Sequence, residues 1–566
     1  MSTAEDLFSS LDTEAEPRLV ELLLRDQRDL TPVERFSQRH EEVEGPPLQA
    51  RYYDDLIPSG LPEKGQQYAF RVDLDLCSGC KACVVACHSL NGLDADETWR
   101  DVGLLVSPDV AFQETVTTTC HHCEDPGCMK GCPVKAYDKD LVTGIVRHLD
   151  DQCIGCHYCV MMCPYDVPKA NPSRGIVRKC DMCTGRLSAG EAPACVQACP
   201  SQAISIEIVE QGRLIPDRLL PVSPGAMPDS SHTRPTTRYV TRKPLPGLLL
   251  PADSAEIFPA KNHPSLAIML VLTQLSVGAF AVESFRPSAD AGLRLAVFLL
   301  ALLFGLAGQV AAVTHLGRPA YAFRAFLGWR TSWMSREVIA FAAFTGLALL
   351  ATAAAGASFW PGSLPGLVAA GPLLLAATTA FGLIGILASS MIYAATGRGF
   401  WSPAPTMGRF LGSVLVLGPA AVLVMDLGWA ALAPVTDSAF LPDTGGLIGA
   451  TMLASTAKLA GEGLFLLRIR MGPTRLEAES ELGRSVRLMG GALRRITAVR
   501  FGLGIVGGLA LPALVLGLSG PKASPDMGLM AAGAATLGLL ACIGAELLER
   551  RLFFSAVSPV SMPGQG

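Results

Sequence analysis

Residues 153–164 read CIGCHYCVMMCP, and this stretch decides how the first half of the chain folds. The run is the ferredoxin pattern C-x2-C-x2-C-x3-C-P, in which three closely spaced cysteines bind one cubane and the fourth binds the other cluster of a pair. Residues 77–87 repeat the spacing, although His88 stands where the proline would be. Gly and Pro interrupt the surrounding sequence too often for long helices. We therefore expect a loop-rich α+β polyferredoxin domain with two ferredoxin-like repeats.

Two more groups of four cysteines lie at residues 120–132 and 180–199. In the group at 120–132 one spacing widens to four residues. In the group at 180–199, Cys183 and Cys195 are twelve positions apart. Sixteen thiolates suffice for four [4Fe-4S] clusters, which form a wire for single electrons rather than a site of bond chemistry. The sixteen predicted iron ligands are Cys77, Cys80, Cys83, Cys87, Cys120, Cys123, Cys128, Cys132, Cys153, Cys156, Cys159, Cys163, Cys180, Cys183, Cys195 and Cys199.

Zinc is the main alternative, because C-x2-C pairs also build tetrahedral zinc sites. Zinc sites usually consist of two pairs separated by a longer loop, without the third cysteine and the Cys-Pro ending seen here. The N-terminal residues show neither an apolar signal region nor a twin-arginine pair, so we expect the cysteines to lie in the cytoplasm. A reducing cytoplasm disfavours disulfides, so these cysteines should bind metal.

Residues 68–208 resemble the four-cluster iron-sulfur subunits of the dimethyl sulfoxide reductase family of molybdenum and tungsten enzymes. The resemblance lies in the sixteen cysteines and in the long interval of the fourth group. It implies that the group at 77–87 pairs with the group at 180–199, and the group at 120–132 with the group at 153–163. The implied ligand sets are Cys77, Cys80, Cys83 with Cys199; Cys180, Cys183, Cys195 with Cys87; Cys120, Cys123, Cys128 with Cys163; and Cys153, Cys156, Cys159 with Cys132.

The composition divides the chain into two physically different parts. Up to residue 260 there are 25 Lys and Arg against 38 Asp and Glu, and beyond it 21 against 13. The whole chain is 50% hydrophobic, with a mean hydropathy of +0.35, which argues against a purely soluble protein. We predict an N-terminal docking extension at 1–66, a ferredoxin-type domain at 67–210, a proline-rich surface linker at 211–260 and a transmembrane anchor at 261–566. The alternative for the extension is a solvated tail, and Thr31 is a candidate helix cap within it.

The second part contains apolar stretches long enough to cross a bilayer, which takes about 20 helical residues. Abundant Gly, Ala and Ser within them would allow close helix packing in lipid. We expect an all-α bundle of eight transmembrane helices, at residues 264–284, 293–314, 337–356, 371–396, 410–433, 446–467, 501–519 and 527–548.

Basic residues in the connections predict the orientation of the bundle. Sixteen lie on the side that carries the ferredoxin domain, and only Arg286, Arg294 and Lys522 lie opposite. By the positive-inside rule, the ferredoxin domain and both termini are cytoplasmic, and the chain is a multi-pass protein of the inner membrane.

Ionisable groups at membrane depth mark function or tight pairing. His315 ends the second stretch and Glu337 opens the third, and an imidazole and a carboxylate could accept the protons of a quinol. The alternative is an interfacial histidine and a helix-capping glutamate. Lys458 and Glu462 are spaced as an ion pair on one helix face, as are Glu546 and Arg550. No stretch holds two histidines placed to bind a haem, so we expect none.

The membrane part resembles the eight-helix quinol-oxidising anchor of the same complexes. The resemblance rests on His263-Pro264, the His-Leu-Gly-x-Pro-x-x-x-Phe motif at 315–323, Ser335-x-Glu337 and residues 544–547. It implies quinol-site roles for His315 and Glu337. This sequence departs from the family in three ways. Tyr321 stands where the family has an arginine. The well-known members face the periplasm, and their two subunits are separate chains, whereas the two are fused here.

We expect an electron-transfer and membrane-anchor subunit that exchanges electrons between the quinone pool and a molybdenum or tungsten bis-molybdopterin catalytic subunit. Quinol oxidation or quinone reduction would occur here, and substrate chemistry on the partner. Candidate chemistries are nitrate reduction and sulfite or formate oxidation, and no nucleic-acid partner is expected. The alternatives are a stand-alone redox sensor and an ion-coupled quinol oxidoreductase that uses Lys458, Glu462 and Glu546.

Overall fold

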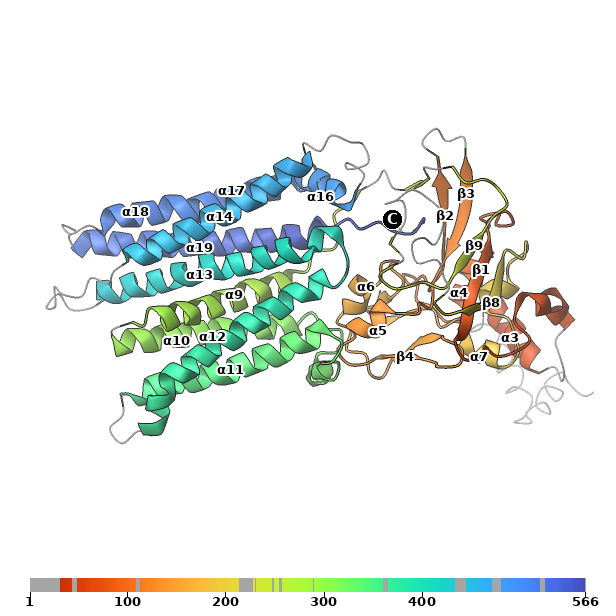
Figure 1. Cartoon of the computed structure of the whole chain (residues 1–566), viewed down its shortest axis with the longest axis horizontal. Helices are drawn as coiled ribbons and strands as arrows, with labels where there is room; N and C mark the ends of the chain where they lie inside the picture. Colours follow the sequence, from red (N-terminus) through yellow and green to blue (C-terminus); the bar gives the residue numbers. More distant parts are fainter. Residues whose placement is uncertain are drawn as a thin grey trace, which may run out of the picture.

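The computed structural model has two parts, a strand-containing domain and a helical bundle, which lie end to end (Figure 1). The fold class predicted from the sequence is confirmed in its two parts, α+β followed by all-α. The described residues are 31–42, 48–107, 112–212, 228–229, 231–246, 249–253, 257–288, 290–359, 365–432, 444–470, 480–519 and 525–564.

A central pair of strands closes the cysteine-rich domain. β1 (Gln66–Asp73) pairs antiparallel with β8 (Ile204–Glu210), so the first and last segments of the domain lie side by side. Between them stand two small hairpins and five short helices, most of which begin beside a cysteine. The hairpins are β4 (Tyr137–Lys139) with β5 (Val146–His148) and β6 (Lys169–Asn171) with β7 (Ile176–Arg178). The helices are α4 (Ala82–Leu90), α5 (Gly127–Gly131), α6 (Tyr158–Met162), α7 (Thr184–Ser188) and α8 (Ala194–Gln197).

Part of the predicted linker is built into this domain. β9 (Arg238–Val240) runs parallel to β1, and β10 (Leu250–Pro251) extends the sheet of β2 (Asp101–Val106) and β3 (Gln113–Thr118). Thr236 and Leu249 are fully buried, and the Thr236 amide donates to the His121 carbonyl. The described part of this proline-rich segment therefore contributes to a core, which composition alone did not indicate.

The N-terminal extension is described from residue 31. Thr31 caps α3 (Pro32–Glu41) in a capping box with Glu34, so the predicted cap is confirmed. Two short 3-10 turns follow, η1 (Leu48–Tyr52) and η2 (Asp54–Leu56). Residues 1–30, on which much of the predicted docking role falls, lie outside the described part of the chain.

The bundle contains seven described spans that are long and apolar enough to cross a membrane, one fewer than predicted. They lie in α9 (Pro264–Phe285), α10 (Ala291–Val313), α11 (Trp333–Ala357), α12 (Pro365–Ala394), α13 (Pro403–Leu432), α19 (Pro525–Ser555) and a continuous run of α17 (Arg494–Ile505), the π-helical η5 (Val506–Ala510) and α18 (Leu511–Leu518). The sixth predicted span forms α14 (Gly445–Arg470), which packs in the bundle but carries Lys458 and Glu462. Those charges lower its apolar character. A short helix, α16 (Glu481–Gly490), follows at the domain end.

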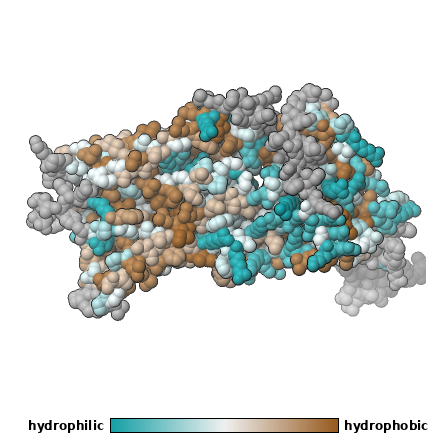
Figure 2. Space-filling model, in the orientation of Figure 1, coloured by the Kyte–Doolittle hydropathy of each residue, from teal (hydrophilic) through white to brown (hydrophobic). Residues whose placement is uncertain are grey.

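Small residues bring the central helices together. A Cβ on Gly278 of α9 would lie 2.6 Å from the Val414 carbonyl oxygen and 2.8 Å from Gly418 Cα on α13. Only glycine permits this backbone approach, which is typical of helices packed in lipid. Hydrophobic side chains cover much of the visible bundle surface, and hydrophilic ones gather over the cysteine-rich domain (Figure 2).

The C-terminal segment returns from α19 to the cysteine-rich domain (Figure 1). Met562 is fully buried in that domain's core, and the Gly564 amide donates to the Asp253 carboxylate. Pro563 passes against Gly103, where a Cβ would collide with its backbone. The two parts are thus joined by the end of the chain as well as by the connection before α9.

Candidate functional site

The sixteen cysteines gather into four sets of four. In each set burial first, and the neighbouring thiols next, raise the pKa of at least one member, so the members lie close together. The sets are Cys77, Cys80, Cys83 and Cys199; Cys87, Cys180, Cys183 and Cys195; Cys120, Cys123, Cys128 and Cys163; and Cys132, Cys153, Cys156 and Cys159. The cysteines that the family resemblance assigns to one set thus lie near one another, and their role as ligands of one cluster stays a prediction.

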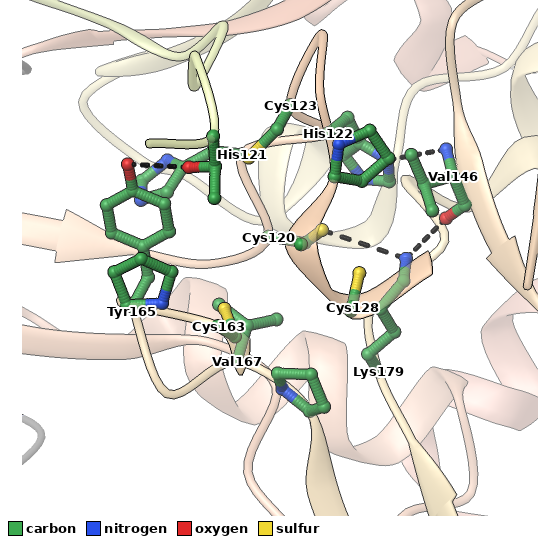
Figure 3. A pocket seen from close by; sticks show the side chains of 15 residues that line it. Cys120, His121, His122, Cys123, Cys128, Val146, Cys163, Tyr165, Val167 and Lys179 are labelled. Carbon is green, nitrogen blue, oxygen red and sulfur yellow. Dashed lines mark hydrogen bonds between the residues drawn. The ribbon is translucent and has the colours of Figure 1, made fainter. Parts of the chain in front are cut away.

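All four cysteines of the set of Cys120, Cys123, Cys128 and Cys163 line one small cavity of about 20 Å³ (Figure 3). A zinc ion would require its sulfur ligands within about 2.3 Å of one point. Within the described residues, no three His, Cys, Asp or Glu side chains converge in that way. Four cysteines around one cavity are the ligand set that a [4Fe-4S] cluster would need.

Cations missed by the sequence analysis lie beside these sets. Lys179 is buried, and its ammonium donates to the Cys180 carbonyl at 2.8 Å and lies 3.7 Å from Cys120 Sγ (Figure 3). Arg100 is also buried, donates to Thr117 Oγ1 at 3.0 Å and has a pKa that nearby cysteines raise against the opposing effect of burial. Positive groups close to thiolates compensate the negative charge of a bound cluster and tune its potential. Lys179 directly precedes a cysteine, a signal that spacing analysis does not use.

The set of Cys132, Cys153, Cys156 and Cys159 faces the bundle. The segment between α10 and α11, which includes η3 (Pro319–Phe326), binds its loops through backbone hydrogen bonds. The Gly317 amide donates to the Gly155 carbonyl at 3.2 Å, and the Gly328 amide donates to the Pro133 carbonyl at 2.7 Å. The cysteine loops therefore rest directly on the helix connection.

Close backbone approach at this contact requires glycine. Gly155 and Gly175 both have positive φ, and a Cβ on Gly175 would lie 2.5 Å from the Gly317 carbonyl oxygen. A Cβ on Gly317 would in turn collide with the Gly175 carbonyl. Larger residues at these positions would push the cysteine loops away from the bundle.

His315 lies at this contact, just after α10. Its Nδ1 is bonded to the Ala312 carbonyl, and its Nε2 is buried without a hydrogen-bond partner. Burial, helped by nearby His157 and His263, lowers its pKa to about 4 against the raising effect of the hydrogen bond to Ala312. The imidazole is thus neutral near pH 7, with its second nitrogen free to bind a ligand.

Glu337 is buried in the second turn of α11 and accepts a hydrogen bond from Ser389 Oγ on α12. Its partner is on another helix, so it does not act as a helix cap. The carboxylate is close enough to raise the pKa of Tyr158, which burial also raises. The Tyr158 hydroxyl donates to the Ile392 carbonyl at 2.9 Å, so α6 contacts α12 directly.

His315 and Glu337 have different hydrogen-bond partners, the Ala312 carbonyl and Ser389. No hydrogen bond or ion pair joins them in the described part of the chain, and each has its neighbours on the cysteine loop, His157 for one and Tyr158 for the other. Both neighbours stand inside the 153–164 run, which sequence analysis assigned to cluster binding alone. The joint role of His315 and Glu337 in a quinol site stays a prediction.

The arginines near Tyr321 bind the cysteine-rich domain. Arg318 donates to the Asp150 carbonyl and Arg324 to the Asp151 carbonyl, each at 2.9 Å. Arg324 also lies over the Tyr321 ring, with 4.4 Å between its Cζ and the ring centre. At this position the chain therefore uses its arginines to hold the two parts together.

The two ion pairs predicted from helical spacing are wrong. Lys458 pairs with Glu546, and Glu462 pairs with Arg500 at 3.0 Å. Glu546 and Arg550 both bond to Ser413 instead of to each other. These side chains point between helices, where partners from other segments are closer than those one turn away.

Comparison with known proteins matches both parts. The 4Fe-4S dicluster domain matches residues 111–208, and the DMSO reductase anchor subunit (DmsC) matches residues 261–441. A subunit of the anaerobic dimethyl sulfoxide reductase of Escherichia coli (strain K12) is 35% identical over 179 residues, which are 30% of this chain and 86% of that protein. The formate dehydrogenase-O iron-sulfur subunit of the same organism is 36% identical over 158 residues, 25% of this chain and 52% of the relative. The chain thus spans about half the length of the formate dehydrogenase relatives.

Proposed function

Because this chain belongs to the dimethyl sulfoxide reductase family, as a fusion of an iron-sulfur subunit with a membrane anchor, we propose that it carries electrons between membrane quinol and a separate catalytic subunit. Four [4Fe-4S] clusters would be held by the four cysteine sets, each accepting and releasing one electron. The units that would do this are the ferredoxin-type domain at 67–210, with its extension at 1–66, and the anchor at 261–566, joined by 211–260.

The observation that carries the proposal is the contact of the 153–164 loop with the connection after α10. The Gly317 and Arg318 amides donate to consecutive carbonyls of that loop, at 3.2 and 3.0 Å. This contact leaves the cluster of Cys132, Cys153, Cys156 and Cys159 beside the buried His315 and Glu337. Electrons could then pass from a quinol bound there to this cluster directly, without a haem between them.

Neighbouring groups in different sets support one order for the wire. It runs from the bundle-facing set to the Cys120 set, then to the Cys180 set and finally to the Cys77 set. Across the sets, Cys120 raises the pKa of Cys180 and Cys195 raises the pKa of Cys83, while Cys159 and Cys128 both raise the pKa of Tyr137. Cys80 of the last set is exposed, so electrons would pass to the catalytic subunit there.

Quinol oxidation would release its protons at His315 and Glu337. The free Nε2 of the neutral imidazole can accept a hydrogen bond from one hydroxyl of the ring, and the buried carboxylate can receive a proton. Each side chain would serve one hydroxyl of the ring.

The catalytic partner would be a molybdenum or tungsten bis-molybdopterin subunit in the cytoplasm. The side is supported by the basic residues of the helix connections, and the partner by the names of the relatives. Nitrate reduction and sulfite or formate oxidation are the chemistries we propose to test first.

Anaerobic purification of the tagged chain in mild detergent tests this proposal. We expect about sixteen irons per chain, four ligand sets each holding a cubane, together with a large partner that contains molybdenum or tungsten. A soluble quinol should reduce the clusters of the wild type, as followed by electron paramagnetic resonance. Clusters that resist quinol but accept dithionite, with no partner recovered, would favour the redox-sensor alternative.

A further inference from the structure

A group of seven charged side chains lies inside the bundle, away from His315 and Glu337. Within the described residues it contains four cations and three carboxylates, so positive charge is in excess by one. Burying an unpaired charge at membrane depth is costly, so such an excess indicates a missing partner. We call this group the charged cluster: Arg409 on α13, Lys458 and Glu462 on α14, Arg500 on α17, and Glu546, Glu549 and Arg550 on α19.

Each of the three carboxylates forms an ion pair with a different cation. Lys458 bonds to Glu546, Arg500 bonds to Glu462 at 3.0 Å, and Arg550 bonds to its neighbour Glu549. The remaining cation is Arg409. It is 8% exposed, and its closest carboxylate atom is Glu549 Oε1, 3.8 Å from its Nε.

Arg409 donates no hydrogen bond to any described residue. Its Nη1 is buried without a partner, although a guanidinium has five donors. The rings of Phe400 and Phe465 lie around it, with 4.6 and 5.7 Å from Cζ to their centres. Aromatic faces hold the cation in place but satisfy none of its N–H groups.

A cavity of about 290 Å³ lies beside Arg409, between α13 and α14. Lys458 and Glu462 also line it, and the Glu462 carboxylate is already bound by Arg500. Gly408 and Gly461 form its rim, where a Cβ would meet nothing within 4 Å, and both are exposed. The cavity is therefore open to the outside of the bundle.

The surface next to the opening is apolar. Leu464 and Leu467 on α14 are 65% and 54% exposed. Arg409 is close to the start of α13, at the end of the bundle that carries the cysteine-rich domain (Figure 1). A ligand at Arg409 would thus lie near one membrane face, with apolar surface alongside.

We propose that this cavity binds a phosphate-type oxyanion through Arg409, with Lys458 as a second donor. Planar guanidinium donors match phosphate oxygens, and the added negative charge would balance the charged cluster. The oxyanion could come from the headgroup of an anionic phospholipid or from free phosphate. The site differs from the proposed quinol site, since no hydrogen bond or ion pair joins Arg409 or Lys458 to His315 or Glu337.

The test uses the full chain, stripped of lipid in detergent and titrated separately with phosphatidylglycerol, phosphatidylcholine and inorganic phosphate. Native mass spectrometry and the unfolding temperature report binding. Arg409→Gln should weaken phosphatidylglycerol binding about tenfold or more, because charge-assisted hydrogen bonds are lost. Gly461→Leu should block binding sterically while it leaves every charge in place.

Gly449→Leu is the matched control, because a Cβ at Gly449 on the same helix also meets nothing within 4 Å. If phosphatidylglycerol binds to this control but not to Gly461→Leu, the oxyanion is a lipid headgroup. If only inorganic phosphate binds, the oxyanion is free phosphate. The proposal fails if Gly461→Leu binds as the control does, if phosphatidylcholine binds as tightly as phosphatidylglycerol, or if neither anion binds.

Discussion

The cysteine-rich domain and the helical bundle are held together by different means. In the domain, α5, α6 and α7 have five residues each and α8 has four, too few to be stable alone. The bundle helices have 22 residues or more in α9 to α14, and they pack through small residues and interhelical bonds. From this difference we expect the first part to depend on bound clusters for its fold, whereas the second should depend on the chain itself.

Iron removal should give the largest difference between the two parts. After chelation under reducing conditions, we expect residues 67–210 to unfold, because the metal supplies much of the folding free energy. The bundle should keep its helices. Circular dichroism with limited proteolysis measures both, and equal loss of structure in both parts would contradict the comparison.

Within the bundle, Lys458→Met should cost about 3–5 kcal/mol, because Glu546 would remain buried without its partner. Denaturation in detergent measures the loss. The double variant Lys458→Met with Glu546→Gln should recover most of it. If Glu462→Gln rescued stability instead, the pairing expected from helical spacing would be right after all.

At the junction of the two parts, His315→Asn should slow cluster reduction by quinol about 100-fold, within the usual range for a general base. Reduction by dithionite should stay unchanged, because the clusters are intact. Stopped-flow absorbance compares the two reductants. An equal loss with both would assign His315 to cluster assembly or packing.

Gly317→Ala should weaken the same junction by about 1–3 kcal/mol, because its Cβ would collide with the Gly175 carbonyl. Quinol-driven reduction should then fall as the cysteine loop moves away. Gly346→Ala is the matched control, since a Cβ there meets nothing within 4 Å. Equal rates and stabilities in both variants would show that the contact can relax at no cost.

The smallest expected effect is on pH dependence. His315 has a folded pKa of about 4, below the unfolded value of about 6.5, so the unfolded state binds its proton first. Stability should therefore fall as pH drops below about 6.5, by about 1 kcal/mol between pH 7 and pH 5.5. Melting curves at the two pH values should differ less in His315→Asn than in the wild type. Identical pH shifts would show that other groups cause the effect.

The parts of the molecule that could be predicted depend on neighbours along the chain. Cysteine spacing, the Thr31 cap and the long apolar stretches are local signals, and each appears in the structure near its predicted place. Glu546 as the partner of Lys458 could not be predicted, because 88 residues separate the two. The same holds for β9 and β10, since nothing in a proline-rich composition reveals a strand partner.

By itself, the sequence determined that sixteen cysteines form a ferredoxin-type array and that an apolar anchor follows, because ligand spacing and hydrophobic length act over short segments. Tertiary structure alone decided which cysteine set faces the bundle and that His157 and Tyr158, within the cluster loop, lie near the buried His315 and Glu337. It also decided that Arg409 donates no hydrogen bond to a described residue. Those outcomes depend on which distant segments fill the same space, and packing settles that only when the whole chain has folded.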